Sequence, residues 1–279
     1  MHTKHKVLTF ALVFIIVFLG LAVWYLATKP QHPAGTEMAT STSATTTPAA
    51  VSTLPTPSAA HLSESAAYYT VDMQYPTGNV FGAAQASAEA NAAAVAAMQQ
   101  YAATTTVQFK TDGGFAHLTK SDIQTMGLGE RKEALSSTYK VYAGSRTVSY
   151  AFTIYEDTLG AHPNTFFKTF TFDTATGKPL SLSDLFIPGS KYLTFLSTQS
   201  RTDIPKLIDK KAGAPGMSDA EMIKSGTTAD EVNFQDFYID GKNFVLLFPP
   251  YQVAAYAVGD LADSIPLSTL ASILKPEYR

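Results

Sequence analysis

The chain has 279 residues, a formal net charge of −3 and no cysteine. The lack of cysteine excludes disulfides, thiolate nucleophiles and cysteine-ligated metals. Because basic residues form no cluster, nucleic acid is not an expected partner.

An uncharged segment follows a short basic start. Residues 7–27 are 21 residues without a charged side chain, and at about 1.5 Å per residue they match the ~30 Å hydrocarbon core of a membrane. Lys4 and Lys6 precede them, so the positive-inside rule predicts that residues 1–6 are a cytoplasmic stub and that the rest is extracytoplasmic. We expect residues 7–27 to be a transmembrane anchor. The alternative is a secretory signal, whose cleavage would release the protein.

The next segment, residues 28–64, has low complexity. Between Thr36 and Ala60 it consists almost entirely of threonine, serine, alanine and proline. Such a composition buries too little apolar surface to offset the entropy of ordering the chain. We therefore expect a disordered linker that tethers a folded part to the membrane.

Residues 65–140 are expected to form an N-terminal subregion with both strand and helix. Alternating apolar residues at 69–75 predict a half-buried strand. The alanine-rich run 82–103 predicts a helix, because alanine has the highest helix propensity. The run TTTVQFK at 104–110 predicts a strand, and the glycine-containing stretch 111–133 predicts a loop with a short helix.

Residues 141–279 are expected to form a C-terminal domain. Strands predicted at 137–144, 146–157 and 164–173 follow one another closely, which is typical of an antiparallel meander. In the second of these strands the apolar residues alternate with smaller or polar ones, which predicts a single apolar face: Val148, Tyr150, Phe152 and Ile154.

Helical segments and a hairpin follow. A short helix is predicted at 184–186, and residues 189–225 are expected to be mostly helical, in pieces interrupted at Pro205 and other breakers. Asp240-Gly241 predicts the tight turn of a hairpin. Since strands and helices interleave irregularly, the expected fold class is α+β, with antiparallel sheets packed with helices.

Common catalytic and metal-binding patterns do not occur in the sequence. It has no His-x-x-x-His pair, no Gly-x-Ser-x-Gly elbow, and no calcium or phosphate loop. Paired carboxylates could in principle support glycoside hydrolysis. The candidates are Glu156, Asp157, Asp173, Asp184 and Asp236. Adjacent acids at a strand end are more typical of a solvated turn. Since the other patterns are also missing from the sequence, we predict no catalytic residue, no metal site and no cofactor.

His162 lies in the turn LGAHPN, between two predicted strands. Gly160 permits unusual backbone angles and Pro163 fixes the next one. The imidazole therefore either bonds a nearby carbonyl at a hairpin corner or offers a polar contact at the loop tip.

A second conspicuous stretch is FPPYQVAAYAVGD, residues 248–260. A buried strand ends at its two prolines and leads into Tyr251 and Tyr256. Tyrosine suits both protein interfaces and sugar stacking, and the alternative is a corner that merely turns the chain. The candidate binding residues from both stretches are His162, Asn164, Tyr251 and Tyr256.

Several short motifs in residues 145–274 together resemble a known family. They are Gly160-Ala161-His162, Thr176-Gly177-Lys178, Leu182 to Phe186, Pro250 to Gly259 and Ile265-Pro266. The pattern is similar to the extracytoplasmic C-terminal domain shared by the lysozyme-binding anti-sigma factor of Gram-positive bacteria and a peptidoglycan deacetylase, where it accompanies a catalytic domain. Residues 141–279 thus look like an anti-sigma-factor-V-like domain.

The resemblance implies an extracytoplasmic α+β module with a lysozyme-like protein or cell-wall glycan as ligand. The sequence departs from the family pattern at Leu159, where glycine is usual, and at Ala255, where proline is common. A cytoplasmic stub of six residues is too short for an anti-sigma domain, so neither named activity is expected to transfer.

We therefore expect a membrane-anchored, non-catalytic binding or sensor domain that recognises a lysozyme-like protein or peptidoglycan. One alternative is a cell-wall-acting hydrolase or deacetylase that pairs His162 with a carboxylate in a cleft. Another is a purely structural envelope protein.

Overall fold

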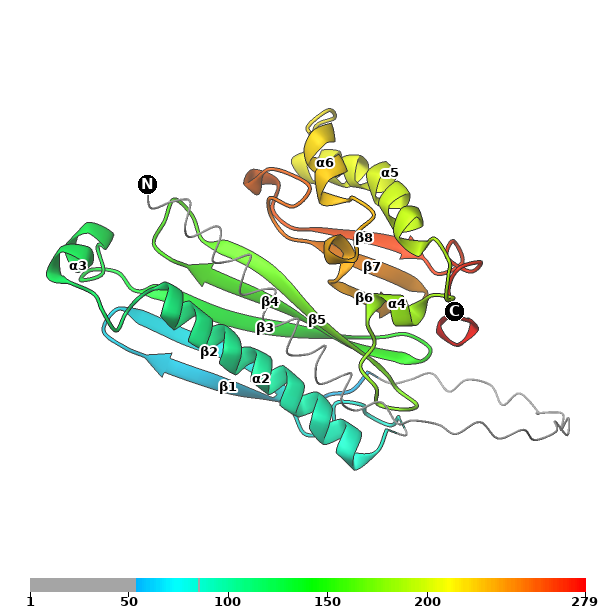
Figure 1. Cartoon of the computed structure of the whole chain (residues 1–279), viewed down its shortest axis with the longest axis horizontal. Helices are drawn as coiled ribbons and strands as arrows, with labels where there is room; N and C mark the ends of the chain where they lie inside the picture. The colour runs from blue at the N-terminus through cyan, green and yellow to red at the C-terminus, as the bar shows by residue number, and fades with distance from the viewer. Residues whose placement is uncertain (1–53, 85) are drawn as a thin grey trace, which may run out of the picture. The chain divides into compact units, whose positions relative to one another are not determined.

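The computed structural model describes residues 54–84 and 86–279 (Figure 1). The predicted stub and anchor, and the linker as far as residue 53, lie outside the described residues. Within the described part, no helix has the length and apolarity needed to cross a membrane. Two β-sheets and several helices make up this part, so the α+β class is confirmed.

The larger sheet has five strands, in the order β1-β2-β3-β4-β5. Their bounds are β1 Ser58–Ser65, β2 Tyr69–Thr77, β3 Glu133–Ala143, β4 Thr147–Asp157 and β5 Asn164–Asp173. Strands β3, β4 and β5 form the predicted antiparallel meander. The expectation of purely antiparallel pairing is wrong at one place, because β2 and β3 are parallel. Parallel neighbours need a long crossover, which here contains helix α2, Ala88–Asp112.

Strand β1 corrects the predicted end of the linker, because residues 58–64 form a strand. Every residue of β1 is in register with β2, and Leu62 packs against the core of this sheet. The Glu64 carboxylate also accepts hydrogen bonds from Tyr69 Oη at 2.7 Å and from Lys110 Nζ on α2 at 2.8 Å. These contacts order a segment whose own composition favours disorder.

Helix α2 also corrects the strand predicted at 104–110, since the helix continues to Asp112. Ala102, Thr106 and Phe109 are buried at helical spacing, and Thr106 Oγ1 donates to the carbonyl of Ala102 at 2.9 Å. Burial of this helical face outweighs the weak helix propensity of the threonine run. The helix starts at Ala88, with Ser87 as its cap.

The smaller sheet is antiparallel and has the order β6-β7-β8. The remaining elements are β6 Phe237–Asp240, β7 Asn243–Phe248, β8 Leu261–Pro266, α3 Lys120–Met126, α4 Leu182–Leu185, α5 Tyr192–Ala212, α6 Ala220–Gly226, η1 Glu231–Phe234, η2 Tyr256–Val258 and η3 Pro276–Tyr278. The predicted hairpin with its turn at Asp240-Gly241 is confirmed, as are the short helix between 111 and 133 and the one near 184.

Pro205 does not interrupt helix α5, contrary to the prediction. A proline inside a helix removes one backbone hydrogen bond and costs about 3 kcal/mol. Ile204 and Ile208 on the same helix are completely buried against the smaller sheet. Their burial stabilises the continuous helix through the proline.

The two sheets and their helices are stacked in layers. Helix α2 covers one face of the five-stranded sheet, and the three-stranded sheet covers part of the other (Figure 1). Helix α5 packs on the outer face of the three-stranded sheet. The first half of β4 is therefore buried on both sides, so Ser149 and Ala151 are buried as well as Tyr150 and Phe152 of the predicted apolar face.

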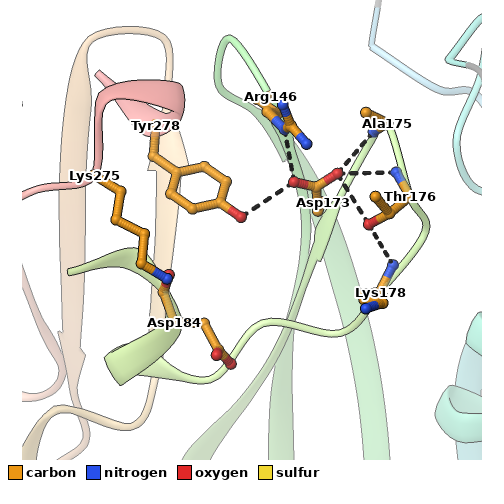
Figure 2. Close-up of polar contacts among 8 residues, drawn as sticks. All are labelled: Arg146, Asp173, Ala175, Thr176, Lys178, Asp184, Lys275 and Tyr278. Atoms are coloured by element: carbon orange, nitrogen blue, oxygen red, sulfur yellow. Dashed lines mark hydrogen bonds and ion pairs between the residues drawn. The ribbon is translucent and has the colours of Figure 1, made fainter. Parts of the chain in front are cut away.

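The C-terminal segment is attached to the five-stranded sheet through Asp173 (Figure 2). This buried carboxylate accepts hydrogen bonds from Arg146 Nε at 2.7 Å, from Tyr278 Oη at 3.1 Å, and from the backbone N–H groups of Ala175 and Thr176, each at 2.9 Å. Burial opposes ionisation, but the bonds from Arg146, Thr176 and Tyr278 together hold the pKa of Asp173 below its usual value. The end of the chain is thus fixed to β4 and β5.

Candidate functional site

The turn between β4 and β5 places His162 at an exposed tip. Leu159 has a positive φ of 57°, and its N–H donates to the Asp157 carboxylate at 2.9 Å. His162 Nδ1 lies 3.0 Å from the carbonyl oxygen of Pro163. A carbonyl only accepts, so Nδ1 carries a proton in this geometry. The hairpin corner expected for His162 is present.

The loop after β7 contains a second unusual backbone conformation. Tyr251 has a φ of 70°, in the left-handed region that side chains other than glycine seldom adopt. Such strain costs about 1–3 kcal/mol and persists only where the surroundings enforce it. Tyr251 is also 53% exposed, so the loop holds an aromatic ring towards solvent at an energetic cost.

These two segments meet through three aromatic side chains. His162 Nε2 is 2.8 Å from Tyr251 Oη, although the residues are 89 positions apart. The His162 ring stacks on Tyr256 with ring centroids 3.6 Å apart and planes inclined by 18°. We call these three residues the His162 cluster. In the neutral tautomer with the proton on Nδ1, His162 Nε2 accepts from the Tyr251 hydroxyl, whose oxygen lone pairs remain available to a ligand.

Contacts behind the loop hold Tyr251 in place. Gln252 Nε2 donates to the carbonyl oxygens of Gly226 and Asn233, both at 3.0 Å, and Val253 and Ala254 are buried. At Gly226 a Cβ atom would lie 1.9 Å from the carbonyl oxygen of Gln252. A glycine is therefore required at the end of α6 for the loop to approach so closely. The loop is supported by packing rather than free.

Asn164, the fourth predicted binding residue, has no described contact with the cluster. It starts β5 opposite Glu156, on the sheet face that carries Ile154 and Phe166 and is covered further along by α2. Its side chain accepts from the N–H of Thr165 at 3.1 Å. Burial raises the pKa of Glu156, and the nearby Asp112 raises it further.

Three of the carboxylates considered for hydrolysis make structural contacts. Asp157 supports the β4–β5 turn through Leu159. Asp184 accepts from Ser181 N–H at 2.8 Å and caps α4. Asp173 binds the C-terminal segment, as described above.

Asp236 is the remaining acid of that set. It accepts from the N–H of Thr169 at 3.0 Å, and burial raises its pKa to about 6. It therefore joins the edge of β5 to the start of β6. In residues 54–84 and 86–279, no three histidine, cysteine or acidic side chains are grouped to hold a metal ion.

Both imidazole nitrogens of His162 are used by a phenol and a carbonyl. A general base normally has one nitrogen free and the other oriented by a carboxylate. The described geometry suits recognition through stacking and hydrogen bonds. The sequence identified the three cluster residues separately, but it carried no signal for Gln252 or Gly226, whose roles depend on a tertiary approach.

Comparisons with known proteins place a recognised domain in the C-terminal part. Residues 183–268 match the model of a family described as a protein of unknown function, DUF3298, so a DUF3298 domain is present. It extends from α4 to the end of β8. It includes Tyr251 and Tyr256, but His162 lies outside it.

Two curated relatives match about half of this chain. The peptidoglycan-N-acetylmuramic acid deacetylase PdaC of Bacillus subtilis is 34% identical over 149 residues, 53% of this chain and 31% of its own length. Esterase Rv3036c of Mycobacterium tuberculosis is 27% identical over 124 residues, 44% of this chain and 51% of its own length. The chain thus spans only 31% and 51% of the length of these two relatives.

A solved structure shares the fold. The crystal structure of a DUF3298 family member from Bacteroides fragilis matches with a TM-score of 0.51 and 16% identity. The match covers 79% of this chain and 93% of that one, so it includes elements outside residues 183–268. At this identity the likeness concerns the fold alone.

Proposed function

We propose that the protein is an extracytoplasmic, non-catalytic binding or sensor domain, anchored through residues 7–27. The His162 cluster is its contact site. The ligand is a component of the cell wall or a lysozyme-like protein. The observation that carries the proposal is the meeting of His162, Tyr251 and Tyr256 at an exposed place, on a strained loop.

The backbone strain at Tyr251 is the reason to assign a function to the loop after β7. A corner that only turned the chain could have glycine at position 251 without strain. Instead an exposed tyrosine adopts a φ of 70°, and Gln252 stabilises this conformation from behind. A site held rigid before binding loses less entropy when the ligand arrives.

A role in the cell wall is supported by the likeness to PdaC, whose name describes a peptidoglycan deacetylase. The resemblance to the extracytoplasmic domain of a lysozyme-binding anti-sigma factor supports a sensor role with a protein ligand. The uncharged segment 7–27 supports the location. Protease treatment of intact protoplasts should digest residues 54–279 if the domain is outside, and protection would contradict the proposed orientation.

The binding experiment uses the full chain, purified in detergent, with two probes: a C-type lysozyme and purified peptidoglycan sacculi. We expect at least one probe to bind, and both His162→Ala and Tyr251→Ala to weaken that binding. Val232→Ala, an exposed apolar residue on η1 with 57% exposure, is the matched control. Lack of binding to both probes, or full binding by both cluster variants, would refute the proposal.

A hydrolase or deacetylase is the second candidate, because the two relatives are named a deacetylase and an esterase. This reading requires His162 to leave Tyr251 and pair with an acid. Turnover of an acetylated peptidoglycan or aryl acetate by the wild type, abolished in His162→Ala, would establish it. A protein with neither binding nor turnover would fit a purely structural envelope role.

A further inference from the structure

Part of the five-stranded sheet is uncovered beside the His162 cluster. The three-stranded sheet covers the face opposite α2 around Ala151, which packs with Tyr238 and Val245. Further along β4 on this same face, Thr153 is exposed and Tyr155 is 39% exposed. The covering therefore ends between residues 151 and 153.

The loop after β7 contacts the five-stranded sheet again at the turn between β4 and β5. The loop after β7 belongs to the covering sheet, and its Tyr251 reaches His162 in the β4–β5 turn. In Figure 1 the turn and this loop lie towards the same end of the molecule. The uncovered residues thus lie between two contacts, one with the three-stranded sheet and one with the His162 cluster.

We call four residues on this face the β4–β5 strip: the exposed Thr153 and Tyr155 of β4, and the half-buried Phe167 and Thr165 opposite them on β5. Thr153 pairs with Phe167, and Tyr155 pairs with Thr165, so all four project from one face. Tyr155 and Phe167 are diagonal neighbours, about 7 Å apart between their backbones. The strip combines two aromatic rings with three hydroxyl groups, one of them on Tyr155, and contains no charged side chain.

We propose that the β4–β5 strip and Tyr251 together bind an uncharged N-acetylhexosamine chain of the kind found in cell-wall glycan. This inference rests on the proposed function and specifies the ligand class of that site. Aromatic rings stack on the apolar faces of sugar rings, while threonine and tyrosine hydroxyls bond their polar edges. An elongated ligand would extend from Tyr251 along β4.

Several features favour a glycan over a protein partner. The exposed ring of Tyr155 on this side of the sheet is otherwise a cost, since the solvent side of a sheet normally carries polar residues. The neighbouring residue on β3, Thr138, is also an exposed hydroxyl residue that pairs with Thr153. A protein interface of this size would be expected to include an arginine among its central contacts, and the strip has none.

The test uses the full chain in detergent and a β-1,4-linked hexamer of N-acetylglucosamine as the probe, measured by isothermal titration. We expect the hexamer to bind and Tyr155→Ala to weaken binding by about fivefold, the effect of one lost stacking contact. Tyr155→Phe should bind nearly as well as the wild type because the ring remains. Val107→Ala, on α2 and 60% exposed, is the control and should bind unchanged.

Each other outcome has a defined meaning. No binding of the hexamer at millimolar concentration, or unchanged binding by a folded Tyr155→Ala, would overturn the glycan assignment. Phe167→Leu, which preserves apolar volume, gives a second test if Tyr155→Ala unfolds. If lysozyme binds and His162→Ala weakens it while the hexamer does not bind, the proposed function stands and this inference fails.

Discussion

The buried site of Asp263 on β8 favours the neutral form of its carboxyl group. Replacing Asp263 with a neutral residue should therefore stabilise the folded protein. Its side chain is 1% exposed, on the face of the three-stranded sheet that packs under α5. Ser200 Oγ on that helix donates to Asp263 Oδ2 at 2.8 Å. Burial raises the pKa of Asp263 from 3.8 to about 6, Ser200 lowers it, and the charge of Asp203 adds to the rise.

The sign of the effect follows from linkage. A folded-state pKa above the unfolded one means that the folded protein binds more protons between pH 4 and pH 6. The contribution of protonated Asp263 to the free energy of unfolding is complete below the unfolded pKa and is lost as the pH rises through about 6. A shift of about two units corresponds to about 3 kcal/mol. Asp263→Asn should therefore increase the free energy of unfolding at pH 7.5 by about 1–3 kcal/mol.

The measurement is urea unfolding, followed by circular dichroism at about pH 4.5 and at pH 7.5. We expect the stability advantage of Asp263→Asn over the wild type to be clearly smaller at the lower pH than at the higher one. Glu130→Gln, an exposed acid before β3, is the control and should change neither value. The reasoning is refuted if Asp263→Asn is less stable at pH 7.5, or if its advantage is the same at both pH values.

Three further predictions concern other parts of the structure. Gly226→Ala should destabilise the fold by about 1–3 kcal/mol, because the added Cβ would overlap the Gln252 carbonyl. It should also weaken ligand binding more than an alanine substitution on the exposed surface of α6 does, and equal binding by the two variants would contradict the role of the loop. Asp173→Asn should lower the free energy of unfolding by about 2 kcal/mol at pH 7, because it leaves Arg146 without its carboxylate. Since the folded pKa of Asp173 is lowered, the difference in unfolding free energy between wild type and variant should shrink as the pH falls below about 4, and a constant difference would contradict this. Deleting Ser58–Ser65 should lower the melting temperature by several degrees through loss of an edge strand, whereas a disordered linker would leave it unchanged.

The sequence predicted elements whose local signals agree with their packing. Asp240-Gly241 gave the β6–β7 hairpin because a tight turn needs a positive φ, and Gly241 has one of 56°. The alternation in β4 predicted its apolar face. It did not predict that Ser149 and Ala151 would be buried as well, because a second sheet covers that side.

The errors occurred where tertiary contacts outweigh local propensity. Residues 104–110 are helical because α2 buries Thr106 and Phe109 against the sheet, and β1 forms from a serine- and alanine-rich segment because β2 provides its hydrogen bonds. In the candidate site, His162, Tyr251 and Tyr256 were identified from residue type and turn context. Their meeting over 89 positions depends on how the two sheets are stacked, which no local pattern encodes.

The order of the strands has a mechanical consequence. Strand β1 runs antiparallel to β2, β2 parallel to β3, and β3 antiparallel to β4, so Ser58 and the β4–β5 turn lie at opposite ends of the sheet. In an anchored protein that holds a wall-bound ligand at this turn, tension would run along the strands. The hydrogen bonds between neighbouring strands would then be loaded together in shear, and they would not open one at a time. Resistance to such pulling is governed by the rate of forced unfolding, so the topology suits the role proposed above, in which the domain would be stretched between a membrane and the wall.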